Sequence, residues 1–166
     1  MKSKLGVIKI GLSITIITIL VILTGYLRDS VFKTINALLR SWDLEQDYFL
    51  PPFLSFLENF EYDTLANLKW ILTLLFSFSY LILSLFAIKL IFNNRKYLEI
   101  TIWTYVGIII LSALFIAIGY LFSGSSEKMY EFARYLMGMA QSPLVLMILI
   151  PTFKLSEKEN FKTSKE

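Results

Sequence analysis

Long apolar segments without charge alternate along this chain with short segments that hold its charged residues. Three uncharged runs, 10–27, 70–88 and 135–153, are 18, 19 and 19 residues long, and a fourth extends over 100–126. An α-helix rises about 1.5 Å per residue, so each of the three covers roughly 27–29 Å, close to the ~30 Å hydrocarbon core of a bilayer. The pattern therefore predicts an all-α, polytopic membrane protein with four transmembrane helices.

The predicted spans cover about residues 7–27, 68–92, 99–122 and 132–153, within a transmembrane domain of residues 1–155. A soluble bundle is the first rival interpretation, but four apolar segments of this length in 166 residues would leave little chain to cover them. A cleavable signal peptide is the rival for the first span. Its apolar run continues to Leu27, beyond the ~7–15 residues of a signal core, which favours a retained helix.

The basic residues predict the orientation of these spans. Ten of the sixteen lie at the N-terminus, between residues 89 and 99 and after residue 153, whereas six lie on the other side together with nine of the thirteen acidic residues. Lys and Arg are enriched in cytoplasmic segments, so both termini are predicted to be cytoplasmic and the loop 28–67 to lie outside. The Lys-, Glu- and Ser-rich tail, 156–166, is predicted to be disordered.

The outer loop has a helical pattern of its own. Apolar residues recur at helical spacing over 29–42, which predicts an amphipathic helix along the membrane interface, capped by Asp29 or Ser30. Two prolines, at 51 and 52, then interrupt the chain before a second short helix or a re-entrant hairpin. Asp63 or Thr64 is predicted to cap the helix that becomes the second span.

Composition narrows the chemistry that the chain can perform. It has no cysteine and no histidine, which removes thiolate nucleophiles, thiol zinc sites and the commonest general base. The basic residues flank apolar segments instead of forming one patch, so no nucleic-acid partner is expected despite a net charge of +3. The sequence contains no catalytic motif and predicts a protein that is not an enzyme and needs no cofactor or metal.

Transport receives little support from the spans, because none of their cores contains a charged residue that could relay ions or protons. Ser77, Ser79 and Ser84 in the second span leave a hydroxyl-lined pore open, although hydrogen bonding between helices is the stronger interpretation.

The fourth span carries the most informative polar residues. Pro143 removes a backbone hydrogen bond and should bend the helix. Gly138 and Ser142, four residues apart, form a small-residue face that allows another helix to approach closely. Gln141 lies near them and needs a hydrogen-bond partner in lipid.

Two arginines lie at the predicted outer ends of spans. Arg28 and Arg134 should lie at similar depth, and Asp29 can pair with Arg134 across two helices. Snorkelling or such an ion pair is one interpretation. The other is that the arginines hold an anionic group, such as a lipid phosphate or a peptide carboxylate.

Several short motifs carry a family resemblance over Gly25 to Leu155. The segments are RDSVF at 28–32, KWILT at 69–73, ARYLMG at 133–138, QSP at 141–143 and IP at 150–151. With these segments the chain resembles small membrane proteins associated with bacterial exosortases. The resemblance implies an accessory role beside an envelope sorting protease in a Gram-negative inner membrane. The protease itself is expected to use Cys, Arg and His, two of which this chain lacks.

Two functions follow as expectations. The first is a non-enzymatic accessory or assembly subunit that contacts a larger membrane partner, or another copy of itself, within the bilayer. The alternative is a small channel, transporter or lipid-binding protein that recognises an anionic group at the outer face.

Overall fold

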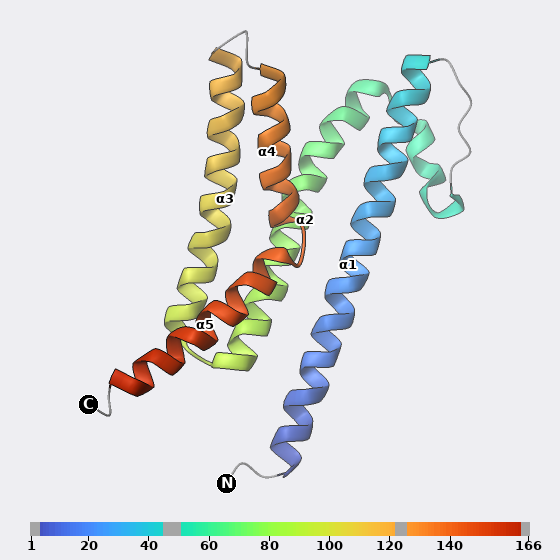
Figure 1. The fold of residues 1–166 in the computed structure, drawn as a ribbon. Helices are drawn as coiled ribbons and strands as arrows, with labels where there is room; N and C mark the ends of the chain where they lie inside the picture. The colour runs from blue at the N-terminus through green and yellow to red at the C-terminus, as the bar shows by residue number, and fades with distance from the viewer. Residues whose placement is uncertain (1–3, 45–50, 122–125, 164–166) are drawn as a thin grey trace.

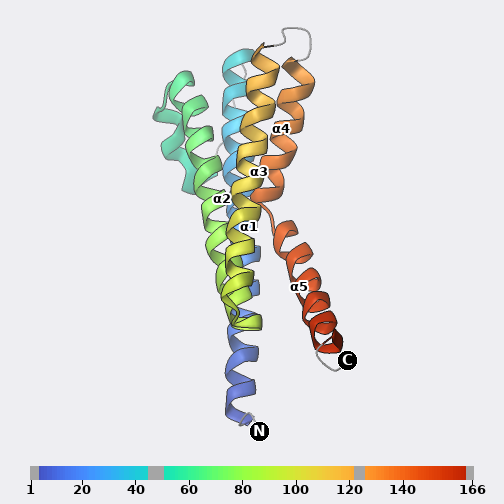
Figure 2. The same ribbon diagram turned by 90° about the vertical axis from the view of Figure 1, so that its left-hand side faces the viewer.

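The computed structural model describes residues 4–44, 51–121 and 126–163, all of them in helices or the short links between helices. Two long helices pack together at the start, α1 (Lys4–Leu44) and α2 (Tyr62–Phe92), with the 3-10 helix η1 (Pro52–Asn59) between them in sequence. A hairpin of α3 (Arg95–Leu121) and α4 (Ser126–Ala140) follows, and α5 (Leu144–Thr163) crosses the lower part of the bundle (Figures 1 and 2). The prediction of an all-α chain is confirmed for the described residues.

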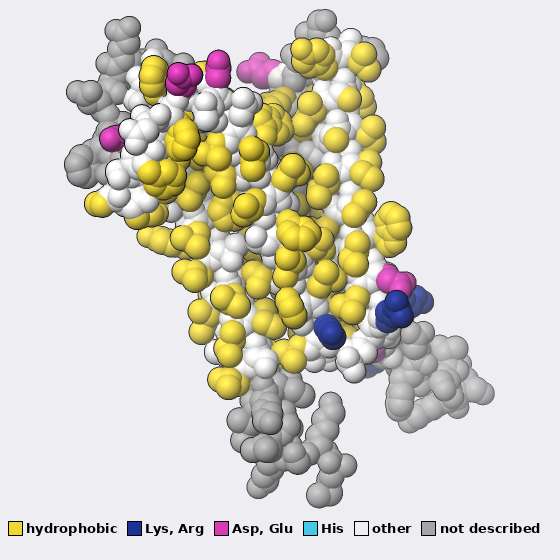
Figure 3. Space-filling view, turned by 180° about the vertical axis from the view of Figure 1, so that it is seen from behind, with side chains coloured by type: hydrophobic (Ala, Val, Ile, Leu, Met, Phe, Trp, Pro, Cys, Tyr) yellow, Lys and Arg dark blue, Asp and Glu magenta, His cyan; other side chains and the backbone are white. Residues whose placement is uncertain are grey.

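The surface of the bundle is that of a helical membrane protein. Helices α1, α2 and α3 are each long and apolar enough to cross a membrane, while α4 and α5 meet the same test only as a bent pair. Large apolar side chains such as Ile22, Phe78 and Trp103 are more than 60% exposed. Figure 3 shows a broad apolar band on the rear face, with acidic side chains mainly at its upper end and Lys and Arg toward the lower end. Such a band is the surface that lipid covers.

One prediction about the outer loop is wrong. Residues 29–42 do not begin a separate helix at Asp29 or Ser30, because α1 runs without interruption from Lys4 to Leu44. Figure 1 shows this segment continuing along the axis of α1 rather than turning across it. No proline or glycine lies between Arg28 and Leu44 to stop the helix, and its apolar residues are buried by packing against protein.

The predicted apolar face of this segment packs on η1 and on the start of α2. Ile35 and Leu38 from α1 meet Leu54 and Leu57 from η1 and Leu65 from α2 in one buried cluster. Of the two alternatives after the prolines, the short helix is the one observed, since η1 covers Pro52–Asn59 with proline in its first turn. The predicted cap of α2 is wrong, because the cap position is Glu61, and Asp63 lies inside the first turn, where its charge favours the helix dipole.

The predicted bend in the fourth span is a complete break. Helix α4 ends at Ala140 and α5 starts at Leu144, with 62° between them. In a continuous helix the N–H of residue 143 would bond the carbonyl of Met139, and Pro143 has no N–H. Ser142 supplies two donors in place of that missing N–H: its backbone N lies 3.2 Å and its Oγ 2.9 Å from the Met139 carbonyl oxygen. The single helix predicted for 132–153 is therefore two helices.

Helix α5 also extends farther than the sequence predicts. The disordered tail was expected from residue 156, whereas the helix continues to Thr163. Lys and Glu are good helix formers, so the polar composition that suggests disorder is compatible with a helix that is already started.

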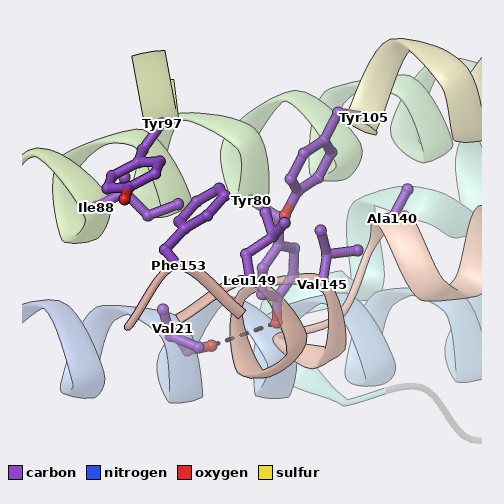
Figure 4. Close-up of a cluster of buried hydrophobic side chains, with 9 residues drawn as sticks. All are labelled: Val21, Tyr80, Ile88, Tyr97, Tyr105, Ala140, Val145, Leu149 and Phe153. Atoms are coloured by element: carbon purple, nitrogen blue, oxygen red, sulfur yellow. Dashed lines mark hydrogen bonds between the residues drawn. The ribbon is translucent and has the colours of Figure 1, made fainter. Parts of the chain in front are cut away.

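Helix α5 is held by an apolar cluster at the lower end of the bundle. Phe153 stacks on Tyr97 of α3 with ring centroids 4.4 Å apart and meets Phe92 of α2 edge-on at 5.8 Å. Figure 4 shows Phe153, Leu149 and Val145 on one side of α5, facing α2 and α3. The cluster fixes the direction in which α5 leaves the break.

Buried hydroxyl groups connect the helices inside the bundle. Ser84 of α2 and the hydroxyl of Tyr105 on α3 lie 2.9 Å apart, and Ser112 of α3 donates to the Ala133 carbonyl of α4 at 2.9 Å. Ser77 and Ser79 instead bond back to carbonyls of their own helix. Ser84 therefore serves helix packing, as the stronger of the two interpretations predicts.

Candidate functional site

The candidate site is a cavity of about 460 Å³ between the upper parts of α1, α2 and α4. Each helix contributes one face at helical spacing: Arg28, Phe32, Asn36 and Leu39 from α1; Tyr62, Ala66, Lys69, Trp70 and Thr73 from α2; Tyr130, Ala133, Arg134, Met137, Gly138 and Gln141 from α4 and its end. The volume lies within the range of small-ligand pockets. Aromatic walls and a few convergent polar groups give it the usual chemistry of a binding site.

The cavity is strongly positive. Arg28, Lys69 and Arg134 line it, and no acidic residue does. Asp29, which does not line the cavity, pairs with Arg28, with its Oδ1 3.1 Å from Nη1. Within the part of the chain that the structure describes, Lys69 and Arg134 form no ion pair. Three cations around one small space repel each other, so an anion bound there would stabilise the arrangement.

Arg28 is held in position by neighbours on three sides. Its Nε donates to Oε1 of Gln141 at 3.1 Å, its Nη1 pairs with Asp29, and its guanidinium lies over the Phe32 ring, 5.9 Å from the centroid. These contacts use two of the five N–H donors of a guanidinium. The remaining donors are oriented in advance, which lowers the entropy lost when a ligand is bound.

Gln141 completes the wall where α4 ends. Its side chain is buried, and the carbonyl oxygen is occupied by Arg28, so what it can offer a ligand is its amide NH₂ group. The partner that a glutamine needs in lipid is thus an arginine from the first helix.

The structure brings together four of the seven residues that the sequence singled out. Arg28, Arg134, Gly138 and Gln141 all line the cavity. The predicted pair between Asp29 and Arg134 is wrong, because Asp29 pairs with its neighbour Arg28.

The other two residues belong to the break between α4 and α5. Ser142 accepts a hydrogen bond from the Leu144 N at 3.4 Å as well as donating to Met139, so it joins the two helix ends. Pro143 faces a second cavity, described below.

The small-residue face does not act as predicted within this chain. A Cβ atom added to Gly138 would meet nothing within 4 Å, so no helix of the described residues packs closely there. Instead the missing side chain leaves room in the cavity wall. Close helix approach occurs at Gly25, where an added Cβ would lie 3.0 Å from the Tyr80 hydroxyl.

Lys69 is the site residue that sequence reasoning missed. From the sequence, Lys69 is predicted to be only a topology determinant at the start of the second span. Its signal was its position: Arg28 directly follows one uncharged run, and Lys69 and Arg134 directly precede two others. Three helices that cross a membrane in register place such residues at one depth.

A second cavity, of about 300 Å³, lies below the first between α1, α2 and α5. Apart from Thr18, it is lined by apolar residues: Ile14, Ile17, Val21, Ile22, Ala87, Ile91, Pro143, Leu146, Met147 and Ile150. It has no charged group and can accept only an apolar occupant.

Neither cavity provides the donors of a metal site. Among the described residues no group of three or more carboxylates lies close enough to hold a metal ion. The polar groups of the upper cavity are three cations, two amides, one hydroxyl, two phenols and one indole N–H, which suit an oxyanion.

Comparison with known proteins adds no relative: no family model matches the chain, and neither the curated proteins nor the solved structures contain a match. The class is therefore defined by the structure alone. The chain is a helical membrane protein with several long apolar helices and a cationic cavity between α1, α2 and α4.

Proposed function

We propose that this protein is a non-enzymatic membrane protein that binds an anionic group, a phosphate or a carboxylate, in the cavity between α1, α2 and α4. The observation that carries the proposal is the convergence of Arg28, Lys69 and Arg134 on one cavity without a lining carboxylate. Arginine forks suit planar or tetrahedral oxyanions, and Lys69 adds a point charge. Electrostatic attraction and preoriented donors then give both affinity and selectivity for negative charge.

The proposed setting is a bacterial inner membrane that the chain crosses four times, with α4 and α5 together forming the fourth span. Both termini are cytoplasmic in this proposal. The start of α1, the α2–α3 link and the end of α5 lie at one end of the bundle in Figure 1, as four crossings require. The basic residues at that end support a cytoplasmic position.

The test is a binding measurement on purified protein in a mild nonionic detergent. Glycerol phosphate and a short peptide with a free C-terminal carboxylate are the probes, which separate the two oxyanion classes. Neutral variants Arg28→Gln, Lys69→Gln and Arg134→Gln should each weaken binding by about tenfold, since a charge-assisted hydrogen bond contributes about 1.5–3 kcal/mol. Lys128→Gln is the matched control, because Lys128 is an exposed cation of α4 outside the cavity.

The outcome that contradicts the proposal is clear. If the three cavity variants and Lys128→Gln bind both probes equally, the cations are topology determinants only. Affinity that falls with rising salt in the wild type, and less steeply in the variants, would support direct neutralisation of the ligand.

An accessory or assembly subunit, as expected beside an exosortase-type sorting protease, is the second candidate. The open space at Gly138 favours it, because a helix of another membrane protein, or of a second copy, could approach α4 there. Co-purification in mild detergent tests this role. Gly138→Leu should release the partner, and repeated isolation of the chain alone would contradict the role.

A further inference from the structure

The upper and lower cavities share their walls. On α1 the lower cavity is lined by Ile14, Thr18 and Val21, and the upper one by Arg28 and Phe32. These residues are spaced by three, four or seven positions, so they lie on one face of a continuous helix. On α2 the step from Thr73 to Ala87 is fourteen residues, again one face.

The third wall of the upper cavity is α4, and that of the lower cavity is α5. The break between these two helices therefore lies between the two cavities. Gln141 lines the upper cavity and Pro143, two residues on, lines the lower cavity. Along α1 the step from Ile22 to Arg28 is six residues, about 9 Å of helix axis, and along α2 the step from Thr73 to Ala87 is about 21 Å. At this level α1 and α2 meet through the Tyr80 hydroxyl, 3.3 Å from the Val21 carbonyl oxygen (Figure 4).

The chemistry of the two cavities matches the two depths of a bilayer. The cations of the upper cavity directly border the uncharged runs, which places them at headgroup level. The lower cavity lies almost entirely within those runs, at the level of the acyl chains. A ligand that fills both must be anionic at one end and a hydrocarbon at the other.

Building on the proposed function, we infer that the ligand is an anionic phospholipid, with its phosphate headgroup between Arg28, Lys69 and Arg134 and one acyl chain in the cavity between α1, α2 and α5. An acyl chain that enters this cavity leaves detergent or lipid and not water, so it gains van der Waals packing against the apolar walls, and the cations supply the selectivity for negative charge. Gly138 and Gln141 leave room for the headgroup beside α4, and Pro143 directs α5 away so that the chain can enter.

The test compares a lipid with its own headgroup. Purified protein in nonionic detergent is titrated with dioleoyl phosphatidylglycerol, with glycerophosphoglycerol, which lacks the acyl chains, and with dioleoyl phosphatidylcholine. Binding is measured by native mass spectrometry for the lipids and by calorimetry for the headgroup. We expect the anionic lipid to bind at least tenfold more tightly than either of the other two probes.

Two variants fill the lower cavity without touching the cations. Ala87→Phe places a ring in its α2 wall, and Thr18→Trp places one at its exposed α1 rim. Each should weaken phosphatidylglycerol binding by about tenfold, because the added ring takes the space of the acyl chain, and leave glycerophosphoglycerol binding unchanged. Ala113→Phe is the matched control, since Ala113 is exposed on α3 and lines neither cavity.

The outcomes separate this inference from the proposed function. If the filled-cavity variants and Ala113→Phe bind the lipid equally, or if glycerophosphoglycerol binds as tightly as the lipid, the acyl chain does not occupy the lower cavity and only the anion site stands. If the peptide carboxylate is the sole ligand that depends on the cations, the lipid is also overturned. Because Thr18 is at an exposed rim, its variant keeps the test decisive even where Ala87→Phe does not fold.

Discussion

Arg28 on α1 donates from Nε to Oε1 of Gln141, where α4 ends, across 113 positions of sequence and 3.1 Å of space. This bond ties the first helix to the break in the last span. In this bond Gln141 is the acceptor that satisfies and orients Arg28. The N–H donors of Arg28 that bond neither Gln141 nor Asp29 are left for the cavity. The stability of the bundle and the proposed binding of an anion therefore depend on the same contact.

Replacing Gln141 separates these two effects. Gln141→Leu leaves Arg28 without its acceptor and should lower the free energy of unfolding by about 1.5–3 kcal/mol, with weaker anion binding. Gln141→Glu keeps the acceptor but adds a negative charge beside Arg28. It should retain stability while weakening anion binding more than Gln141→Leu does. Thermal unfolding in detergent and glycerol phosphate titration check both, and equal binding by the two variants would show that the charge of the cavity is not what binds.

Gly25 allows a close contact between α1 and α2. An alanine there would place its Cβ 3.0 Å from the hydroxyl of Tyr80, which is buried and bonded to Val21, so Gly25→Ala should destabilise the protein by about 1–3 kcal/mol. Tyr80→Phe removes the obstructing oxygen, and the double variant should recover part of the loss in a double-mutant cycle. Gly107→Ala, where an added Cβ meets nothing within 4 Å, is the control and should be neutral or slightly stabilising.

Phe153 fixes α5 against α2 and α3. Phe153→Ala removes the stacking on Tyr97 and leaves a gap in a buried cluster, so it should cost up to about 3 kcal/mol of unfolding free energy. Phe86→Ala is the control, because Phe86 is 60% exposed toward lipid and loses few protein contacts. Unfolding of both variants in the same detergent gives the comparison. Similar losses would mean that α5 is held by something other than this cluster.

The proposed topology predicts which residues are reached from outside the cell. The chain has no cysteine, so Glu58→Cys and Lys96→Cys each introduce a unique thiol, on η1 and near the start of α3 respectively. A membrane-impermeant maleimide should label residue 58 in intact cells and residue 96 only after permeabilisation. Labelling of both residues from the same side would exclude a single crossing by α2.

The apolar spans were predictable because a bilayer imposes one length on every helix that crosses it. The uninterrupted α1 was not, because Asp29 and Ser30 are good caps in isolation, and tertiary packing of Ile35 and Leu38 decides that the helix continues. Pro143 predicted a bend in the fourth span. The extent of the break also depends on Ser142, which donates two hydrogen bonds to the Met139 carbonyl oxygen. The position of Lys69 beside an uncharged run was visible in the sequence, but only the packing of α1, α2 and α4 shows that Lys69 lines one cavity with Arg28 and Arg134.

The length of α1 gives the molecule a mechanical property. Its 41 residues measure about 60 Å, twice the thickness of the hydrocarbon core, and the last sixteen or so project about 24 Å past Arg28. Helix α1 is continuous from Arg28 to Leu44. A 5° tilt of its apolar half would therefore displace the Leu44 end by about 2 Å over the 24 Å beyond Arg28. Ile14 and Val21, which line the lower cavity, lie on the same continuous helix as Ile35 and Leu38, so a change of packing at that cavity that tilts α1 would also move these residues and the 3-10 helix packed on them.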